Sequence, residues 1–260
     1  MLRTVTVTRY VTPLREGGSL PAIVDADDGR AYVLKFRGAG QGQRALIAEV
    51  LGGEIGRVLG LPIPELVLME LDPILARSEP DPEIQALIEA SGGINLGLEY
   101  IPEALGFDPL AVPLVIPDLA ATIVWFDAYI TNVDRTVRNP NLLLRRRELW
   151  LIDHGAALYF HHSWDEYLSR SRAPFSRVKD HVLLPFAASI TEADARLAPL
   201  LTREKLANIV AALPDSWLGD EPRFADLVEH RAAYLAYLIE RLKTPRAFAE
   251  GAEDARLAHL

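Results

Sequence analysis

The chain has 260 residues and contains no cysteine. Disulfides, thiolate nucleophiles and cysteine-ligated metal sites are therefore excluded, and the N-terminal residues lack a signal-peptide pattern, so we expect a cytoplasmic protein. The chain also lacks a basic surplus, because 27 Lys and Arg residues stand against 36 Asp and Glu residues and leave a net charge of −9. This balance argues against nonspecific binding to nucleic acid, which requires positive charge to neutralise phosphates.

Long uninterrupted apolar runs are absent as well. The most apolar stretch, residues 110–126, is broken by Pro113, Pro117 and Asp118, so we predict no membrane-spanning segment. The sequence shows no repeat of fixed period and no low-complexity tract. Half of the residues are hydrophobic, which is typical of a globular protein with enough apolar material for a core.

Strand and turn patterns dominate the first third of the chain. "PAIVDA" and "AYVLKF" flank the turn "DDGR" and predict a hairpin, and "TVTVTRYV" alternates as a preceding strand. A helical period follows from Gln43 to Gly60, in which Gly52 and Gly53 indicate either close packing or a break. "IPELVLMEL" and "GINLGLEYIPEA" predict two further strands.

Helical patterns dominate the chain after Asp118, which is a candidate cap for the first of these helices. A short hairpin, "NLLLR" and "LWLID", interrupts them, and further helices are predicted over 192–201, 203–213 and 222–242. We therefore expect an α+β fold in two parts. Residues 1–103 would form an antiparallel sheet with one helix, and residues 104–260 would form a mainly helical part.

Acidic and amide side chains gather around the second predicted hairpin. Asp134, Asn139 and Asn141 precede it in "NVDRTVRNPN", and Asp153 ends it in "IDHG". A hairpin brings its two ends together, and oxygen ligands of this kind suit Mg²⁺, which takes one or two carboxylates and completes its shell with substrate phosphates. The alternative interpretation is that Asp134 caps a turn and Asp153 stabilises the bend that follows.

A lysine and a glutamate add a second feature. Lys35 lies in the strand "YVLKF", where a lone lysine usually points to solvent, but Glu49 on the next helix is placed to pair with it. Such a pair would orient an ammonium group toward a polyphosphate.

The order of strand Lys, helix Glu, Asp–Asn loop and Asp-x-Gly resembles the protein-kinase-like superfamily. Within it the chain resembles the HipA-like kinases, in particular a compact stand-alone type with a loop like "NVDRTVRNPN", from about Arg3 to Leu242. The resemblance implies a bilobal kinase-like fold that uses ATP and Mg²⁺ and transfers phosphate to a hydroxyl acceptor.

The resemblance also implies roles for single residues. Lys35 would contact the α- and β-phosphates of ATP with Glu49 holding it, and Asp134 would orient or deprotonate the acceptor hydroxyl. Asp153 would bind the metal. In "LEYIP", the backbone groups of Glu99 and Ile101 would bind adenine.

The chain departs from the family pattern in three places. Asn139 stands at the usual spacing after Asp134, but Asn141 directly precedes the strand, so we favour Asn141 as the metal ligand and keep Asn139 as second. His154 replaces the phenylalanine of Asp-Phe-Gly. The Gly-rich loop is reduced to Gly17, Gly18 and Ser19, which either cover phosphates or form a plain hairpin turn.

Three functions agree with this pattern. The first is an ATP- and Mg²⁺-dependent phosphotransferase acting on a protein Ser or Thr, or on a small molecule. The others are a nucleotide-binding pseudokinase or scaffold without activity, and a kinase fold that transfers AMP. The sequence does not determine the acceptor or the oligomeric state.

Overall fold

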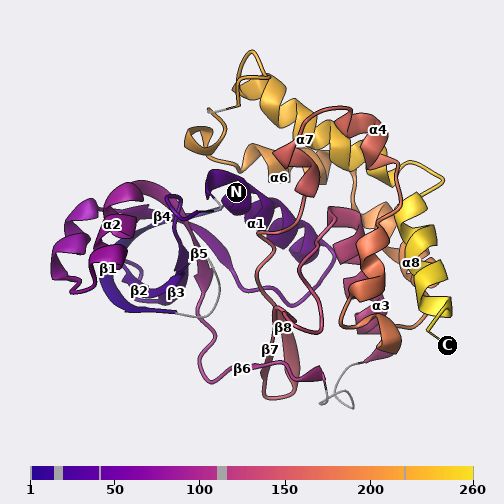
Figure 1. The fold of residues 1–260 in the computed structure, drawn as a ribbon, viewed down its shortest axis with the longest axis horizontal. Coiled ribbons are helices and arrows are strands. Elements are labelled where there is room, and N and C mark those ends of the chain that lie inside the picture. Colours follow the sequence, from indigo (N-terminus) through magenta and orange to yellow (C-terminus); the bar gives the residue numbers. More distant parts are fainter. Residues whose placement is uncertain (1, 15–19, 41, 110–115, 220, 260) are drawn as a thin grey trace.

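The structure is a computed structural model that describes residues 2–14, 20–40, 42–109, 116–219 and 221–259. A β-barrel lies at one side of the molecule, helices α3 to α8 lie at the other, and α1 lies between them (Figure 1). No helix in the described ranges is both long enough and apolar enough to cross a membrane.

Five strands close the barrel in the order β1-β2-β3-β5-β4. Their bounds are Thr4–Pro13 for β1, Ala22–Ala26 for β2, Ala31–Lys35 for β3, Leu66–Leu71 for β4 and Gly93–Glu99 for β5. Neighbouring strands are antiparallel except β1 and β4, which pair in parallel. Alternating residues of the strands, such as Val24, Leu34 and Met69, fill the interior.

The prediction of an antiparallel sheet with one helix is therefore wrong in two respects. The parallel β1–β4 pair closes the sheet, and a 3₁₀ helix η1 (Pro73–Ser78) and a second helix α2 (Pro82–Ala90) follow β4. Asp81 caps α2 by accepting a hydrogen bond from the Glu83 backbone N–H. Ile84 and Ile88 bury one face of this short helix against the barrel core.

Helix α1 (Gly42–Val58) joins the two parts of the molecule. It packs against β4 on one side and α6 on the other, and its apolar residues belong to the large core of the helical part. The helix is continuous through Gly52 and Gly53, so the two glycines mark close packing rather than a break. A Cβ atom on Gly52 would meet the Cβ atom of His154 at 2.9 Å.

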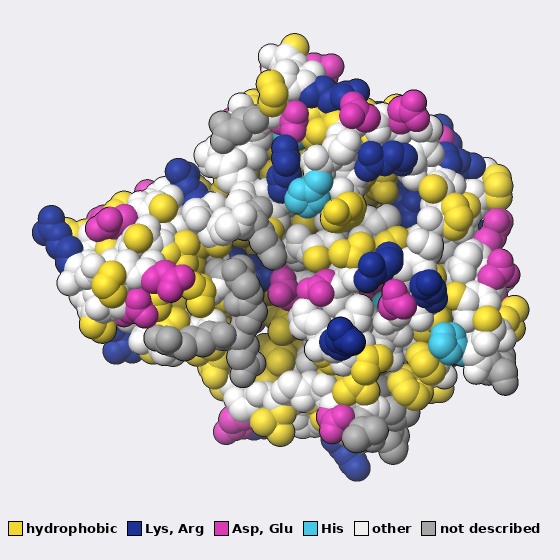
Figure 2. All heavy atoms as spheres, viewed as in Figure 1, with side chains coloured by type: hydrophobic (Ala, Val, Ile, Leu, Met, Phe, Trp, Pro, Cys, Tyr) yellow, Lys and Arg dark blue, Asp and Glu magenta, His cyan; other side chains and the backbone are white. Residues whose placement is uncertain are grey.

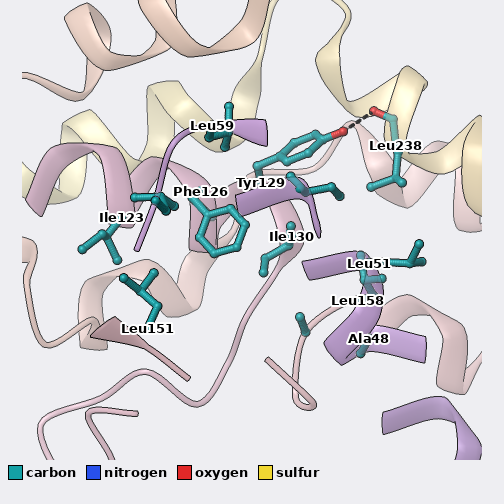
Figure 3. Close-up of a cluster of buried hydrophobic side chains, with 14 of the residues drawn as sticks. Ala48, Leu51, Leu59, Ile123, Phe126, Tyr129, Ile130, Leu151, Leu158 and Leu238 are labelled. Carbon is teal, nitrogen blue, oxygen red and sulfur yellow. Dashed lines mark hydrogen bonds between the residues drawn. The ribbon is translucent and has the colours of Figure 1, made fainter. Parts of the chain in front are cut away.

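The helical part surrounds α3 (Pro117–Ile130), whose aromatic residues Trp125, Phe126 and Tyr129 are fully buried. The Tyr129 hydroxyl donates a hydrogen bond to the Leu238 carbonyl at 3.0 Å, and Ala48 and Leu51 of α1 lie beside Leu158 in the same core (Figure 3). The other helices are α4 (Tyr167–Ser171), α5 (Ile190–Leu197), α6 (Arg203–Ala211), α7 (Leu227–Leu242) and α8 (Ala247–Leu257). Short 3₁₀ helices connect them: η3 (Tyr159–His162), η4 (Ser176–Asp180), η5 (Leu184–Phe186), η6 (Ala198–Leu200) and η7 (Asp215–Trp217).

One expectation for the helical part is corrected. Asp118 lies inside the first turn of α3 and does not cap it, because the helix begins at Pro117 after the cap residue Ile116. After Pro245 the chain forms a further helix, α8, which buries Phe248 against Trp125 and Tyr129.

The predicted second hairpin is confirmed. Strands β7 (Leu142–Arg145) and β8 (Glu148–Leu151) pair antiparallel, and β6 (Leu105–Gly106) adds a third strand beside β7. Leu142 pairs with Leu151. The register therefore places Asn141 and Ile152 opposite each other at the open end of the hairpin, directly before Asp153.

Replacing Gly52 by alanine tests the close approach of α1 to His154. Alanine favours the helix by up to about 1 kcal/mol, but overpacking a filled core costs about 1–3 kcal/mol, and the Cβ of His154 cannot rotate away. We expect Gly52→Ala to lower the free energy of unfolding by about 1 kcal/mol or more in urea titrations. Gly106→Ala, where a Cβ would meet no atom within 4 Å, is the control and should change little. Equal stability of both variants would contradict this packing.

Candidate active site

Lys35 stands at the centre of the candidate site, at the end of β3. Its ammonium group donates to Glu49 of α1 and to Asp153 Oδ1, the latter at 2.6 Å. The side chain of Glu49 is fully buried, whereas 44% of the Asp153 side chain is exposed. One cation therefore joins the barrel, α1 and the loop after β8, and only the Asp153 side of this cluster opens to solvent.

The charges of the cluster shift the ionisation of its members. Burial alone would lower the pKa of Lys35, but the charges of Glu49 and Asp153 raise it well above its usual range. Burial alone would raise the pKa of Glu49, but the Lys35 ammonium and the hydrogen bonds from His154 hold it well below its usual range. Lys35 and Glu49 are therefore both charged over the ordinary range of pH.

His154 fixes Glu49 from the other side. Its backbone N–H lies 3.0 Å from both carboxylate oxygens of Glu49, and its ring Nδ1 lies 3.2 Å from Oε1. The ring is buried and meets Phe126 edge-on. His154 thus anchors the α1 carboxylate through its backbone N–H and its ring, and the ring contact is one that a phenylalanine could not make.

Asp134 lies in the loop between α3 and β7, together with both candidate asparagines. The side-chain amide of Asn139 donates to Asp134 Oδ2 at 2.7 Å, and that of Asn141 donates to the same oxygen at 3.2 Å. Asn139 is exposed, while Asn141 is half-buried at the start of the hairpin. The three residues predicted around this loop are therefore in contact.

The hairpin places Asn141 near the chain segment that leads to Asp153. The Ile152 backbone N–H donates to the Asn141 carbonyl at 3.1 Å. Both Asn141 and Asp153 adopt the left-handed backbone region, with φ of 48° and 57°. Asparagine and aspartate are among the non-glycine residues that tolerate this region best, which fits their occurrence at these two bends.

A buried ion pair supports the Asp134 loop. Arg135 donates to Asp127 Oδ2 at 2.5 Å, and neither side chain is exposed. The other end of the Arg135 guanidinium donates to the carbonyls of Asn141 and Ile152. Arg135 therefore ties the loop to both strands of the hairpin.

Asp127 and His181 are positioning residues that the sequence analysis missed. His181 Nε2 lies 3.0 Å from Asp127 Oδ2, and Asn132 donates to Asp127 Oδ1 at 2.9 Å. Burial would raise the pKa of Asp127, but the Arg135 charge and the His181 hydrogen bond hold it well below its usual range. The available signal was a lone acid inside the apolar pattern of "IVWFDAYI".

The structure describes only some of the residues that were predicted to bind the nucleotide. A small cavity beside Lys35 and Asp153 is also lined by Gly42, Ala45 and Gly155. At the end of β5, the Glu99 N–H donates to the Glu65 carbonyl, whereas Ile101 N–H donates to no other described residue. Gly17, Gly18 and Ser19 lie outside the described residues.

The donor atoms suit a hard cation. Asp153, Asp134 and the amide oxygens of Asn139 and Asn141 are all oxygen ligands, the class that Mg²⁺ prefers. Within the described ranges, no three His, Cys, Asp or Glu side chains form a cluster able to hold a metal alone. A cation here would thus need amide oxygens, water or substrate phosphates as further ligands.

Comparison with known proteins points to kinases. A family model described as HipA-like kinase matches residues 7–249. No curated protein matches the chain. Among solved structures, the chain is similar to the Helicobacter pylori proinflammatory kinase CtkA, with a TM-score of 0.59, 15% identity, and coverage of 98% of this chain and 99% of that chain.

A second similar structure is a Golgi casein kinase with Mn and ADP bound. Its TM-score is 0.50 and its identity 14%, and the match covers 95% of this chain and 76% of that chain. At these identities the two structures establish a kinase-like fold of mixed α and β content.

The depressed pKa of Glu49 predicts an acid-labile contribution to stability. A carboxylate of this kind stabilises the fold above its unfolded pKa of about 4.3, and that contribution is lost as the pH falls below this value. We expect Glu49→Gln to lower the free energy of unfolding at pH 7 by up to about 3–5 kcal/mol. The decline between about pH 5 and pH 2 should also be smaller in the variant than in the wild type.

Urea titrations at several pH values measure both effects. Glu89→Gln, at an exposed position of α2, is the matched control and should follow the wild type. Parallel acid declines in Glu49→Gln and the wild type would show that Glu49 is not the group responsible.

Proposed function

This chain belongs to the HipA-like kinase family, and on that premise we propose that it transfers the γ-phosphate of ATP to a hydroxyl acceptor with the help of Mg²⁺. The observation that carries the proposal is the largely buried Lys35 side chain, whose ammonium is held by Glu49 and Asp153. A neighbour of the same fold that holds Mn and ADP supports the use of a nucleotide and a divalent metal.

In this proposal the nucleotide lies between an N-lobe, residues 1–103, and a C-lobe, residues 104–260. Lys35 binds the α- and β-phosphates, and Glu49 keeps the ammonium in place because it is itself held by His154. The free N–H of Ile101, with the Glu99 backbone, binds the adenine edge. Gly17, Gly18 and Ser19 are kept as candidates for covering the phosphates.

Asp153 and Asn141 hold the metal in the proposed site, with Asn139 as the second candidate amide. When bound, Mg²⁺ supplies positive charge that offsets the charge of the phosphates. The exposed part of the Asp153 carboxylate can face such an ion, while its Oδ1 contacts Lys35.

Asp134 aligns the acceptor hydroxyl and accepts its proton in the proposed mechanism. Two amides, from Asn139 and Asn141, fix the orientation of its carboxylate. Arg135 and Asp127 hold the loop beneath it, so the carboxylate is oriented before any substrate binds.

Calorimetry with ATP tests the metal site. We expect Mg²⁺ to tighten ATP binding by about tenfold or more, which corresponds to about 1.4 kcal/mol, and Asp153→Asn to abolish this dependence. Asp254→Asn, an exposed change on α8, removes the same charge and should behave as the wild type. Binding that ignores both Mg²⁺ and the Asp153 variant would favour a pseudokinase.

The same titrations separate the two asparagines. Because Asn141 is half-buried at the hairpin end and Asn139 is exposed, we expect Asn141→Ala to weaken the Mg²⁺ effect more than Asn139→Ala. A larger loss of the Mg²⁺ effect in Asn139→Ala than in Asn141→Ala would identify Asn139 as the metal ligand instead.

Replacement of Asp134 tests catalysis apart from binding. We expect Asp134→Asn to lower kcat by about 10²–10⁴-fold while leaving ATP binding nearly unchanged, because Asp134 does not contact Lys35. Transfer of labelled γ-phosphate to mixed Ser- and Thr-containing peptides gives the rate, and mass spectrometry of the product distinguishes phosphate from AMP. An unaltered kcat would remove Asp134 from the proposed mechanism.

A further inference from the structure

A large open hollow lies in the helical part, against the loop that carries Asp134. Its volume is about 1060 Å³ including the part open to solvent. The residues that line the hollow include Thr131, Val133, Tyr159, Arg170, Phe175 and Arg177. Val133 directly precedes Asp134 in the chain, so the hollow is lined by the loop that carries the carboxylate proposed to align the acceptor.

Backbone hydrogen bonds fix this neighbourhood. The Leu158 N–H donates to the Ile130 carbonyl at 2.7 Å, and the Val182 N–H donates to the Arg135 carbonyl at 3.1 Å. The segment 158–182, which contributes most of the wall, is therefore attached at both ends to the chain around Asp134. The two attachment points, Ile130 and Arg135, lie on either side of Asp134 in the chain.

The charge of the hollow is opposite to that of the protein. Its described lining contains two arginines and no acid, although the chain carries a net charge of −9. Among the described residues, Arg170 donates only to backbone carbonyls, those of Phe160, of Ser163 at 2.9 Å and of Asp165 at 3.2 Å, so no described carboxylate pairs with it. On the face of the helical part seen in Figure 2, Lys and Arg side chains are interspersed with Asp and Glu side chains.

Arg177 is the more available of the two cations. Its one described ion pair, with Asp180, has an N–O distance of 3.3 Å, and the two side chains are 56% and 45% exposed. Exposed pairs of this kind contribute little energy and are readily exchanged for another partner. The guanidinium can therefore turn to an anionic group in the hollow.

We propose that this hollow binds an acidic peptide segment and presents a Ser or Thr hydroxyl of it to Asp134. This inference rests on the proposed function and names the acceptor of that same site. The hollow is wide and open, and 61% of Tyr159 on its rim is exposed. Small molecules are usually enclosed on most sides, so these features favour an extended chain. In this proposal the aromatic side chains of the hollow contact the apolar stems of the peptide's side chains, and the arginines select the peptide's carboxylates.

The transfer is balanced without further reactants. The acceptor oxygen forms a bond to the γ-phosphorus, while the bond from that phosphorus to the oxygen shared with the β-phosphate breaks. ADP leaves with the electron pair of the broken bond, and the hydroxyl proton passes to Asp134.

Three synthetic peptides of equal length test the inference, each with one Ser flanked by Glu, Gln or Lys. With labelled ATP and Mg²⁺, we expect kcat/KM to fall from the Glu to the Gln to the Lys peptide, with at least about a tenfold difference between the extremes. The difference should shrink at high salt, because exposed charges are screened.

Reversing one charge makes the test specific. Arg177→Glu should lower kcat/KM for the Glu peptide and raise it for the Lys peptide, and Arg177→Gln should flatten the series. Arg196→Glu makes the same charge change on the exposed face of α5, away from the hollow, and should keep the wild-type order.

Three outcomes would overturn the inference. One is equal kcat/KM for all peptides, and another is a preference that survives in Arg177→Glu. The third is transfer to a small alcohol, such as free serine, with no transfer to any peptide. If ATP binding requires Mg²⁺ and Asp153 in these cases, the proposed function stands and only the acceptor is wrong. Absence of nucleotide binding would instead overturn the proposed function, and this inference with it.

Discussion

The largely buried side chain of Lys35 is the constraint on which the arrangement of the molecule depends. A buried cation is tolerated only when it is paired, and here its partners come from different elements: Glu49 from α1 and Asp153 from the loop after β8. Since Lys35 itself ends β3, the barrel, the connecting helix and the hairpin must all meet at one point. Gly52 makes this arrangement possible because it has no Cβ atom, and α1 approaches His154 too closely at this position to accommodate one.

A second buried charge pair organises the other side of the site. Asp127 and Arg135 are both inaccessible, and Arg135 reaches the carbonyls of Asn141 and Ile152 at the open end of the β7–β8 hairpin. The same hairpin end continues into Asp153, the partner of Lys35. The two charge centres thus share one short hairpin, so a displacement of either is transmitted to both Asp134 and Asp153.

Local patterns in the sequence predicted much of this arrangement, and distant pairings were missed. Both hairpins and α1 follow from turn residues and apolar periods within a few neighbouring positions, and the contact of Lys35 with Glu49 follows from their order on adjacent elements. The parallel β1–β4 pair depends on strands about 60 residues apart, which no local pattern marks. Asp127 and His181 were missed for the same reason, since their meeting depends on the packing of α3. The roles of the site residues and the division into lobes stay predictions.

The charge count of the Lys35 cluster explains why nucleotide and metal belong together in the proposed function. Two carboxylates share one ammonium, so the cluster carries one negative charge in excess, and the exposed portion of Asp153 bears it. A polyphosphate alone would be repelled by that excess charge. With a cation facing Asp153, Lys35 remains held by the buried Glu49, and its positive charge becomes available to phosphate oxygens. The charges of these three side chains therefore support metal-dependent binding in the proposed function, without any movement of the barrel or of α1.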